Sequence, residues 1–430
     1  MSADQVSRQA LAVVLAGGQG SRLGLLTRAR CKPALPFGGR CRSIDFTLSN
    51  CVNSGVTRIA VATQYHAQSL IQHIQESFGF LNRERGEFIE IWSAEQREQP
   101  RSYAGTADAV FQNLTALDRC KPRYVVVLAA DHVYRMDYSG LLSFHRESRA
   151  GLTIACQPVP AEQARHFGVM TVDRDEVKVF REKPAVVAGG SDVLASMGVY
   201  VFDSDLLRTL LRDDAARADS AHDFGRDVIP ACVRSPHIRV CAHRLRDPCT
   251  GGPGYWRDIG TVDAYWSANM ELLTGSGGID LYDPDWPIWS APDRFPPTRI
   301  PLEPLGRSTV VSQTVVANGC RLEGATVKRS ILFNGVHVGT GSVVEDSVLL
   351  PGARVGARCR LRRVVIDEGV QVACGTSLGG DAIAPAGCCC EVSAGGVTVV
   401  SGPAAVRRPA EARVNGQKKR LATARDALVA

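Results

Sequence analysis

The first 270 residues alternate short apolar runs with longer stretches of helical periodicity. The apolar runs are rich in Val, Ile and Ala and show little alternation, which is typical of parallel strands covered on both faces. They span Leu11–Leu15, Arg58–Ala62, Tyr124–Ala129 and Leu152–Val159, and the helical pattern is clearest over Ala67–Phe78 and Ala107–Arg119. The alternation predicts an α/β fold with a doubly wound, mostly parallel, Rossmann-like sheet.

A different pattern begins after residue 280. Seven of the 22 prolines fall within residues 281–305, where fixed φ angles and missing donors predict an extended, irregular linker. Apolar residues then recur every 17 positions, in the series Val315, Leu332, Leu349 and Ile366; Val327, Val344 and Leu361; and Val338, Val355 and Val372. Steps near six residues with apolar corners predict a left-handed parallel β-helix, and a sandwich of unrelated strands is the alternative.

The chain therefore divides into four expected regions. These are an α/β domain over 1–280, the linker over 281–305, a β-helix over 306–400 and a basic, flexible tail over 401–430. The tail carries a net charge of +5, so the other 400 residues are almost neutral. Nucleic-acid binders usually carry their charge as a patch on the folded body, and we expect no nucleic-acid partner here.

Targeting signals and metal-binding cysteine patterns are not expected. The N-terminus has no apolar stretch behind a basic region, and no apolar run reaches the ~18 residues of a membrane span. The 14 cysteines are scattered without metal-ligand spacing, although Cys388-Cys389-Cys390 form an unusual triplet. Free thiols in a reducing cytoplasm are the simplest account.

A glycine-rich turn with Gly17, Gly18 and Gly20 follows the first apolar run. Backbone N–H groups of such a turn can approach phosphates closely. A dinucleotide fingerprint would need glycine at Leu23, and a Walker loop would need Gly-Lys-Ser/Thr, so neither motif fits. Arg22 and Lys32 add two cations, which suit a triphosphate whose pyrophosphate leaves.

Asp131 follows the strand predicted at Tyr124–Ala129. An acid at the carboxyl end of a parallel strand lies on the ligand side of the sheet, where it can hold Mg²⁺. Asp258 is a candidate for a second metal-binding carboxylate. At this point Asp131 could equally be a helix cap, and Asp258 could be a partner for Arg257.

Several further motifs give the chain a resemblance to the sugar-nucleotide pyrophosphorylases, and among them to the bacterial glucose-1-phosphate adenylyltransferase family. The motifs are LAGGQGSRL at 15–23, KP at 32–33, IDFTLSNC at 44–51, TQY at 63–65, GTADAV at 105–110, FGVM at 167–170, EKP at 182–184, ASMG at 195–198 and YWRDIGT at 255–261. The glycine turn alone resembles many nucleotidyltransferases, whereas the full set in this order resembles one family.

The resemblance implies a reaction and roles for the matched positions. The expected reaction converts ATP and glucose 1-phosphate to ADP-glucose and diphosphate for glycogen synthesis, with Mg²⁺, in a cytoplasmic homotetramer. The implied catalytic residues are Arg22, Lys32 and Asp131; the metal ligands Asp131 and Asp258; the nucleotide-binding residues Gly17, Gly18, Arg22, Gly105 and Thr106; and the glucose 1-phosphate residues Tyr103, Gly168, Glu182, Lys183 and Ser196.

The chain also departs from the family pattern. Ala130 stands where the family usually has glycine, and its methyl group could crowd the site. An anionic metabolite effector is expected, with Arg30, Arg42 and Gln64 as candidate ligands. The family's C-terminal basic–aromatic cluster is absent.

The sequence leaves three alternative functions to distinguish. The first is a pyrophosphorylase for UDP-, dTDP- or GDP-sugars. The second is a bifunctional enzyme with an acyltransferase β-helix, for which His337 is the candidate base. The third is a non-catalytic regulatory subunit, which the retention of Arg22, Lys32 and Asp131 disfavours.

Overall fold

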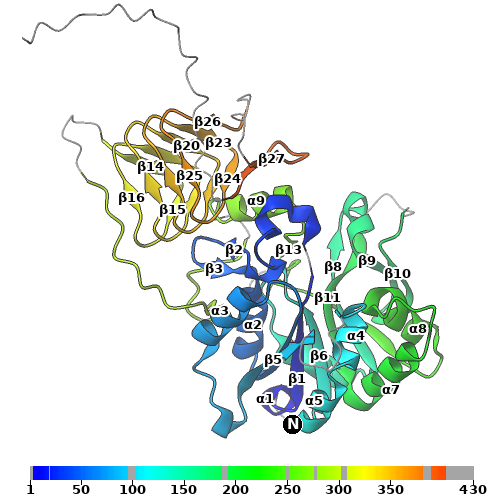
Figure 1. The fold of residues 1–430 in the computed structure, drawn as a ribbon. Helices are drawn as coiled ribbons and strands as arrows, with labels where there is room; N and C mark the ends of the chain where they lie inside the picture. Colours follow the sequence, from blue (N-terminus) through cyan, green and yellow to red (C-terminus); the bar gives the residue numbers. More distant parts are fainter. Residues whose placement is uncertain are drawn as a thin grey trace, which may run out of the picture.

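The computed structural model describes residues 3–18, 20–94, 102–185, 192–247, 251–275, 278–301, 308–380 and 389–402. The predicted basic tail lies outside the described residues except for residues 401–402, and so does Cys388 of the cysteine triplet. The described chain forms an α/β part joined to a stack of short parallel strands (Figure 1).

Within these residues, nine strands form one large sheet, called here the main sheet, in the order β5-β4-β1-β6-β11-β8-β12-β10-β9. They are β1 (Ala10–Ala16), β4 (Arg58–Thr63), β5 (Phe88–Ser93), β6 (Tyr124–Ala129), β8 (Leu152–Val159), β9 (Gly168–Asp173), β10 (Glu176–Glu182), β11 (Val193–Asp203) and β12 (Val240–Arg244). The four predicted strands are β1, β4, β6 and β8. Strands β5, β4, β1 and β6 pair in parallel, whereas β11 runs antiparallel to β6 and β8.

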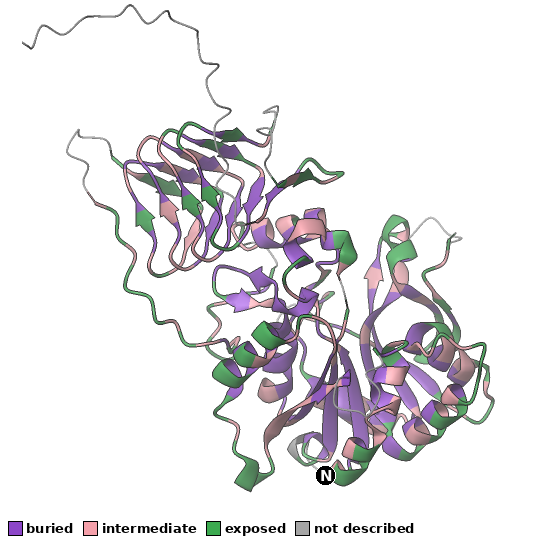
Figure 2. Ribbon diagram, in the orientation of Figure 1, coloured by how far each residue is buried: buried purple, intermediate pink, exposed green. Residues whose placement is uncertain are grey.

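Helices cover both faces of the main sheet. Alternate residues of β1 explain why: Ala12 and Val14 belong to one buried apolar cluster, and Leu11 and Val13 to another. The first face packs against α2 (Ser43–Asn53), α3 (Gln68–Phe78) and α6 (Tyr138–Glu147), and the second against α4 (Thr106–Phe111), α5 (Leu114–Cys120), α7 (Ser204–Ala215) and α8 (Ile229–Arg234). Figure 2 shows the buried strands between these layers.

The single helix predicted over Ala107–Arg119 is wrong, because the chain forms α4 and α5 instead. Asn113, between them, has non-helical angles (φ −105°, ψ 15°). Its side chain donates to the carbonyl of Ala109 at 2.8 Å and to the Tyr103 hydroxyl at 3.1 Å. Asparagine side chains compete in this way with helical hydrogen bonds, and the helix is interrupted.

The C-terminal strands form three parallel stacks, as the 17-residue repeat predicts. The stacks are β14 (Val310–Ser312), β17 (Thr326–Lys328), β20 (Val343–Glu345), β23 (Arg360–Arg362) and β26 (Ser377–Leu378); β15 (Val315–Val316), β18 (Ile331–Leu332), β21 (Val348–Leu349), β24 (Val364–Ile366), β28 (Thr398–Val400) and β27 (Cys390–Val392); and β16 (Arg321–Leu322), β19 (His337–Val338), β22 (Arg354–Val355) and β25 (Gln371–Val372). The β27–β28 pair alone is antiparallel among them.

The first coil corrects one position of the repeat. Leu332, Leu349 and Ile366 are in register, but the residue that pairs with Leu332 is Val316 rather than Val315. The first coil is therefore one residue out of step with a strict 17-residue period. Val316 packs against the interior of the stacked strands, whereas Val315 packs against a cluster shared with the α/β part.

That shared cluster joins the two parts of the protein. It contains Phe37 and Tyr265 from the α/β part and Ile331 and Val399 from the stacked strands. Helix α9 (Val262–Glu271) lies at this junction, and the Trp266 indole donates to the backbone carbonyl of Asp346 at 2.8 Å. Within the described residues, no helix combines the length and apolar character needed to cross a bilayer.

Candidate active site

The candidate site lies at the carboxyl ends of β1 and β6, where parallel-sheet proteins bind ligands. Asp131 follows β6 and precedes β7 (His132–Tyr134), which pairs antiparallel with β13 (Trp256–Asp258). This pairing places Asp258 opposite His132 in the register. The two candidate carboxylates, 127 positions apart in the chain, are thus brought together by one short ladder.

Lys32 joins the two carboxylates. Its Nζ lies 2.7 Å from Oδ2 of Asp131 and 3.0 Å from Oδ1 of Asp258. Burial alone would lower the pKa of Lys32, but the two carboxylates hold it above its ordinary value. Burial would likewise raise the pKa of Asp131, yet Lys32 and then His132 hold it well below its usual range. At neutral pH Lys32 and Asp131 are therefore both charged.

The geometry decides between the alternatives for both aspartates. A strand rather than a helix follows Asp131, and the cap of α6 is Asp137, so Asp131 is not a helix cap. Arg257 pairs with Glu271 at 3.0 Å, so Asp258 is not its partner. Ala130 is fully buried in the apolar cluster of the opposite sheet face, and its methyl group does not line the pocket described next.

The carboxylates suit a divalent cation. Ligand atoms of Asp131, His132 and Asp258 lie within 4.8 Å of one another. Nε2 of His132 is 3.6 Å from Asp131 and 3.8 Å from Asp258. Two carboxylates that share one cationic partner form a donor set of the kind that hard metal ions prefer.

Asp131 borders a pocket of about 420 Å³, which we call the substrate pocket. The glycine turn contributes Gly17 and Gly18 on one side. Gln64 orders this side, since its Nε2 donates to the Gly17 carbonyl at 3.2 Å and its Oε1 accepts from the Tyr103 N–H at 2.7 Å. An added Cβ on Gly18 would meet nothing within 4 Å, so its backbone is open to a ligand.

Gly105 and Thr106 form the neighbouring wall at the start of α4. A Cβ on Gly105 would clash with the carbonyl oxygens of Ala221 and His222. The Thr106 hydroxyl donates to Asp223 at 2.9 Å and accepts from the Phe224 N–H at 3.0 Å. Glycine is therefore required where α4 meets the 221–225 segment, and Thr106 fixes that contact.

The opposite wall contains Glu182, the last residue of β10, and Lys183, and the two side chains pair at 3.2 Å. Gly168 lies behind them, because a Cβ there would clash with Phe180 and Glu182. Ser196 does not line the pocket but lies 3.2 Å from the Tyr200 hydroxyl, which does. Ser196 is thus one residue removed from a ligand in this pocket.

Sequence reasoning missed Tyr200, Asp223, Phe224 and Gly225, all of which line the pocket. The run Asp223-Phe224-Gly225 lies more than 90 residues from Asp131, and nothing in its local pattern indicates a site. It forms a π-helical turn whose start Asp223 caps with two backbone N–H contacts. Such single-turn π segments are frequent at functional sites, but their geometry becomes visible only in a structure.

Arg22 lies apart from the substrate pocket. It borders a second hollow of about 540 Å³, together with His166, Trp256 and Asp258. Asp131 thus faces one hollow and Asp258 the other, with Lys32 between the carboxylates. The structure brings Lys32, Asp131 and Asp258 together as expected but places Arg22 on the far side of the carboxylate pair.

The three candidate effector residues do not line one pocket. Arg30 pairs with Asp367 at 2.7 Å and Glu368 at 3.2 Å, both from the stacked strands. Arg42 donates to the Ser69 carbonyl at 3.0 Å. Gln64 belongs to the substrate pocket instead. Arg30 does line a separate hollow of about 440 Å³ at the junction, with Arg28, His66 and Glu391.

Comparison with known proteins agrees with this fold. The nucleotidyl transferase family profile matches residues 11–275, and the profile of the GlmU-like C-terminal hexapeptide matches residues 296–400. A glucose-1-phosphate adenylyltransferase of Nitrosospira multiformis is 48% identical over 390 residues, which cover 89% of this chain and 91% of the relative. Relatives with the same name in Paramagnetospirillum magneticum and Nitrosococcus oceani are each 47% identical, over 87% and 88% of this chain and 90% of each relative.

The sheet, the glycine turn and the paired carboxylates define the protein as a nucleotidyltransferase with a C-terminal hexapeptide-repeat domain. The similarity over nearly nine-tenths of its length is more specific. The chain belongs to the glucose-1-phosphate adenylyltransferase family.

Proposed function

We propose that the protein catalyses the reaction of ATP with glucose 1-phosphate to give ADP-glucose and diphosphate. The observation that carries this proposal is the Lys32 ammonium held between Asp131 and Asp258 at the edge of the substrate pocket. A pocket of about 420 Å³ is within the ~300–1,000 Å³ typical of small-ligand sites. The family of its relatives supports the choice of nucleotide and sugar.

The reaction depends more on positioning and charge neutralisation than on a general base. A phosphate oxygen of glucose 1-phosphate attacks the α-phosphorus of ATP in line, the P–O bond to the β-phosphate breaks, and diphosphate carries away the electron pair. Because the nucleophile is already an anion, no proton has to be removed. Lys32 stays protonated near its carboxylate partners and supplies positive charge beside the transferring group.

The other residues of the proposed site lie on different walls of the substrate pocket. Gly17 and Gly18 would present backbone N–H groups to the phosphates, and Gly105 and Thr106 would border the nucleotide. Lys183, with its ammonium largely exposed, would neutralise the sugar phosphate, and Glu182 would accept hydrogen bonds from sugar hydroxyls. Tyr103 is anchored through its backbone N–H and its hydroxyl. Gly168 supports Glu182, and Ser196 supports Tyr200.

Asp131 and Asp258 would hold Mg²⁺, with His132 beside them. When bound, the ion supplies positive charge to phosphate oxygens during transfer. Arg22, in the hollow on the Asp258 side, would bind the departing diphosphate. This assignment explains why an arginine of the glycine turn lies away from Gly17 and Gly18.

Four further expectations belong to the same proposal. They are division of the chain at residues 281–305, left-handed winding of the stacked strands, assembly as a homotetramer, and regulation by an anionic metabolite. For the last, the hollow with Arg28, Arg30 and His66 offers the cationic lining, and Arg42 lies close enough to Glu368 and Arg30 to feel their charges.

A diphosphate-release assay tests the proposal. With glucose 1-phosphate and Mg²⁺, release with ATP should exceed release with UTP, dTTP or GTP by at least ~100-fold, since a site that hydrogen-bonds one base rejects others. Release with UTP or dTTP but not ATP would reverse the choice of nucleotide. No release with any of the four would favour a non-catalytic subunit.

A further inference from the structure

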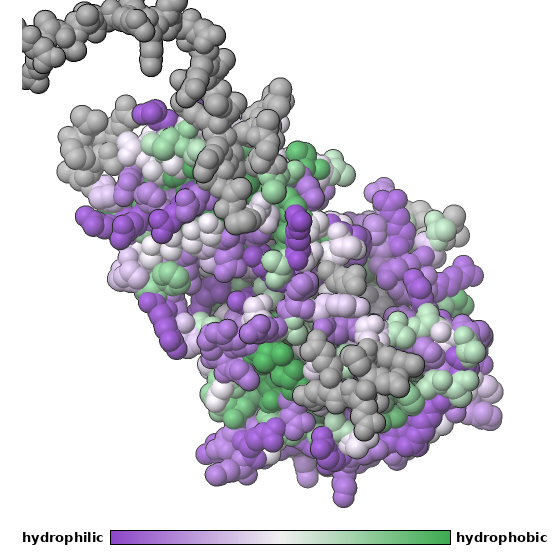
Figure 3. Space-filling view, viewed as in Figure 1, coloured by the Kyte–Doolittle hydropathy of each residue, from purple (hydrophilic) through white to green (hydrophobic). Residues whose placement is uncertain are grey.

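One outer face of the stacked strands carries a row of cationic side chains, which we call the arginine ladder. It is formed by Arg299, Arg321, His337 and Arg354. The last three pair directly in the register of β16, β19 and β22. Arg299 extends the row, because it forms a parallel bridge with Arg321, and its N–H donates to the Cys320 carbonyl at 2.8 Å. Figure 3 shows hydrophilic side chains along this part of the molecule.

The arginine ladder lies away from the junction with the α/β part. That junction uses the stack of β15, β18, β21 and β24, whose residues Ile331, Val348 and Val365 belong to the shared apolar cluster. The stack of β16, β19, β22 and β25 forms a separate side, and the three arginines of the ladder are exposed. Because neighbouring strands lie ~4.8 Å apart, the four cations form a straight row about 14 Å long.

Few negative charges balance the ladder. Glu323, whose Oε2 lies 3.3 Å from Nε2 of His337, is the only acid among residues 321–323, 337–338, 354–355 and 371–372. Within the part of the chain that the structure describes, the three arginines form no ion pair. Like charges that face each other on neighbouring strands repel and destabilise a sheet. The ladder is therefore a concentration of positive charge that these strands do not neutralise.

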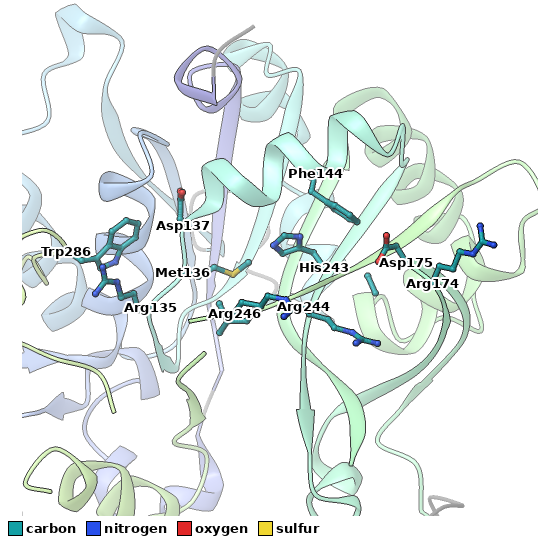
Figure 4. Close-up of a pocket in the computed structure, with 12 residues that line it drawn as sticks. Arg135, Met136, Asp137, Phe144, Arg174, Asp175, His243, Arg244, Arg246 and Trp286 are labelled. Atoms are coloured by element: carbon teal, nitrogen blue, oxygen red, sulfur yellow. The ribbon is translucent and has the colours of Figure 1, made fainter. Parts of the chain in front are cut away.

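Two other charged surfaces show the contrast. On a neighbouring stack, Lys328, Glu345 and Arg362 pair in register, so the sign of the charge alternates from strand to strand. In the hollow drawn in Figure 4, Arg135 pairs with Asp283, and two further aspartates line the same walls. Acids accompany the cations in both places, whereas the arginine ladder leaves its cations open to an external anion.

The residues of the ladder favour phosphate groups over other anions. Guanidinium groups match phosphate oxygens in geometry as well as in charge. None of the strands β16, β19, β22 and β25 contains Phe, Tyr or Trp, on which the bases of a nucleic acid would stack. A single row of cations also fits a linear anion better than it fits the plane of a membrane surface.

We propose that the arginine ladder binds inorganic polyphosphate, a linear chain of phosphates joined through shared oxygen atoms. The chain lies across the strands, and its phosphates contact Arg299, Arg321, His337 and Arg354. Every unit of this chain carries negative charge and none carries a bulky group, so the chain can follow a row of side chains at the spacing of a sheet. Gln371 pairs with Arg354 in the register and extends the row with an amide donor. The site is separate from the substrate pocket and does not depend on the proposed reaction.

Fluorescence anisotropy with end-labelled, long-chain polyphosphate tests the site on the full-length protein. Arg321→Ala/Arg354→Ala should weaken binding at least ~10-fold, as loss of two charge-assisted contacts implies. Lys328→Ala/Arg362→Ala removes the same number of positive charges from the neighbouring stack, and this matched control should bind within a few-fold of the wild type. The basic residues of 401–430 are present in every protein compared, so they do not account for a difference between the two variants.

Competition experiments then identify the anion. Long-chain polyphosphate should displace the label at least ~10-fold more effectively than tripolyphosphate at equal total phosphate, because a short chain contacts fewer cations at once. Single-stranded DNA or poly-glutamate that competes as well as polyphosphate at equal charge would overturn the choice of ligand. Equal loss of affinity in the two double variants, or no loss in either, would overturn the site. Neither result depends on catalysis, so failure of the proposed reaction would be recognised separately.

Discussion

The Nζ atom of Lys32 lies 2.7 Å from the carboxylate of Asp131, in a site where that carboxylate also faces Asp258. Two carboxylates this close repel each other unless a cation lies between them. The lysine supplies that cation permanently, and a divalent ion can supply more. The charge of the site is therefore set by three residues from three separate segments of the chain.

Replacement of Asp131 by asparagine should lower kcat by at least ~100-fold, because a main ligand for the ion is lost while the shape is kept. The measurement is diphosphate release at saturating Mg²⁺. Asp213→Asn, on the exposed side of α7, is the control and should match the wild type. Activity within a few-fold of the wild type would show that Asp131 does not hold the metal.

The pKa shifts give a second prediction. The lowered pKa of Asp131 means that its ionised form stabilises the fold above its ordinary pKa of 3.8, and that this contribution is lost only in stronger acid. The raised pKa of Lys32 means that its contribution is present below 10.5 and is lost at higher pH. Neither group should titrate between pH 5 and 9, so neither should contribute a pH dependence to the binding of Mn²⁺, used as a spectroscopic probe, in that range.

Lys32→Met provides the contrasting case. Without the ammonium group, burial and Asp258 both raise the pKa of Asp131. Mn²⁺ binding to this variant, followed by electron paramagnetic resonance, should weaken between pH 7 and pH 5. A pH-independent affinity in the variant would mean that Lys32 does not control the ionisation of Asp131.

A third prediction concerns the start of α4. Gly105→Ala should reduce kcat/KM at least ~10-fold, because the new methyl group meets the carbonyl oxygens of Ala221 and His222 and pushes Thr106 away from Asp223. Gly140→Ala, in α6, meets nothing within 4 Å and should be neutral or stabilising by up to ~1 kcal/mol. Equal kinetics for the two variants would contradict the proposed fit.

A fourth prediction compares two ion pairs. Arg30 and Asp367 are both nearly buried, with side-chain exposures of 12% and 9%, and they connect the α/β part to the stacked strands. Arg30→Ala should lower the free energy of unfolding by about 3 kcal/mol, since it leaves a buried carboxylate unpaired. Arg329→Ala removes a more exposed pair with Asp346 and should cost much less. Urea denaturation measures both, and similar losses would argue against a structural role for Arg30.

Thiol reactivity gives a fifth prediction. Burial raises the pKa of Cys156 and Cys232 to about 12, so both remain protonated at neutral pH. Cys374 and Cys389 are exposed. Iodoacetamide should therefore modify Cys374 and Cys389 in the native protein, and Cys156 and Cys232 only after unfolding. Early modification of Cys156 in the native state would show that the sheet opens locally.

Strands of the main sheet were predictable because burial on both faces leaves a continuous apolar signal, as in β6 from Tyr124 to Ala129. The repeat predicted the parallel stacks for a similar reason. The repeat gave the wrong register at Val315, because this residue packs against the cluster shared with the α/β part. A periodicity cannot show which of two cores an apolar residue joins.

The site was predictable where a motif carries its own chemistry and not where tertiary structure creates the contact. Asp131 after β6 and the glycine turn are local signals. Tyr200 and Asp223 reach the pocket only because a sheet and a π-helical turn bring them there. Arg22 was expected with Gly17 and Gly18, yet Gly20 adopts a left-handed conformation (φ 68°) between them and the chain turns toward Asp258.

The hydrogen bond from the Leu25 N–H to the Glu391 carboxylate, 3.3 Å long, spans 366 positions of the chain. Glu391 belongs to the hairpin of β27 and β28. This hairpin also contacts α9, because the carboxylate of Asp263 accepts from the Gly395 N–H at 3.0 Å. Synthesis proceeds from the N-terminus, so Leu25 is translated 366 residues before Glu391. Final assembly of the catalytic face is therefore a late event in biogenesis, and an incomplete nascent chain cannot yet have its glycine turn fully supported.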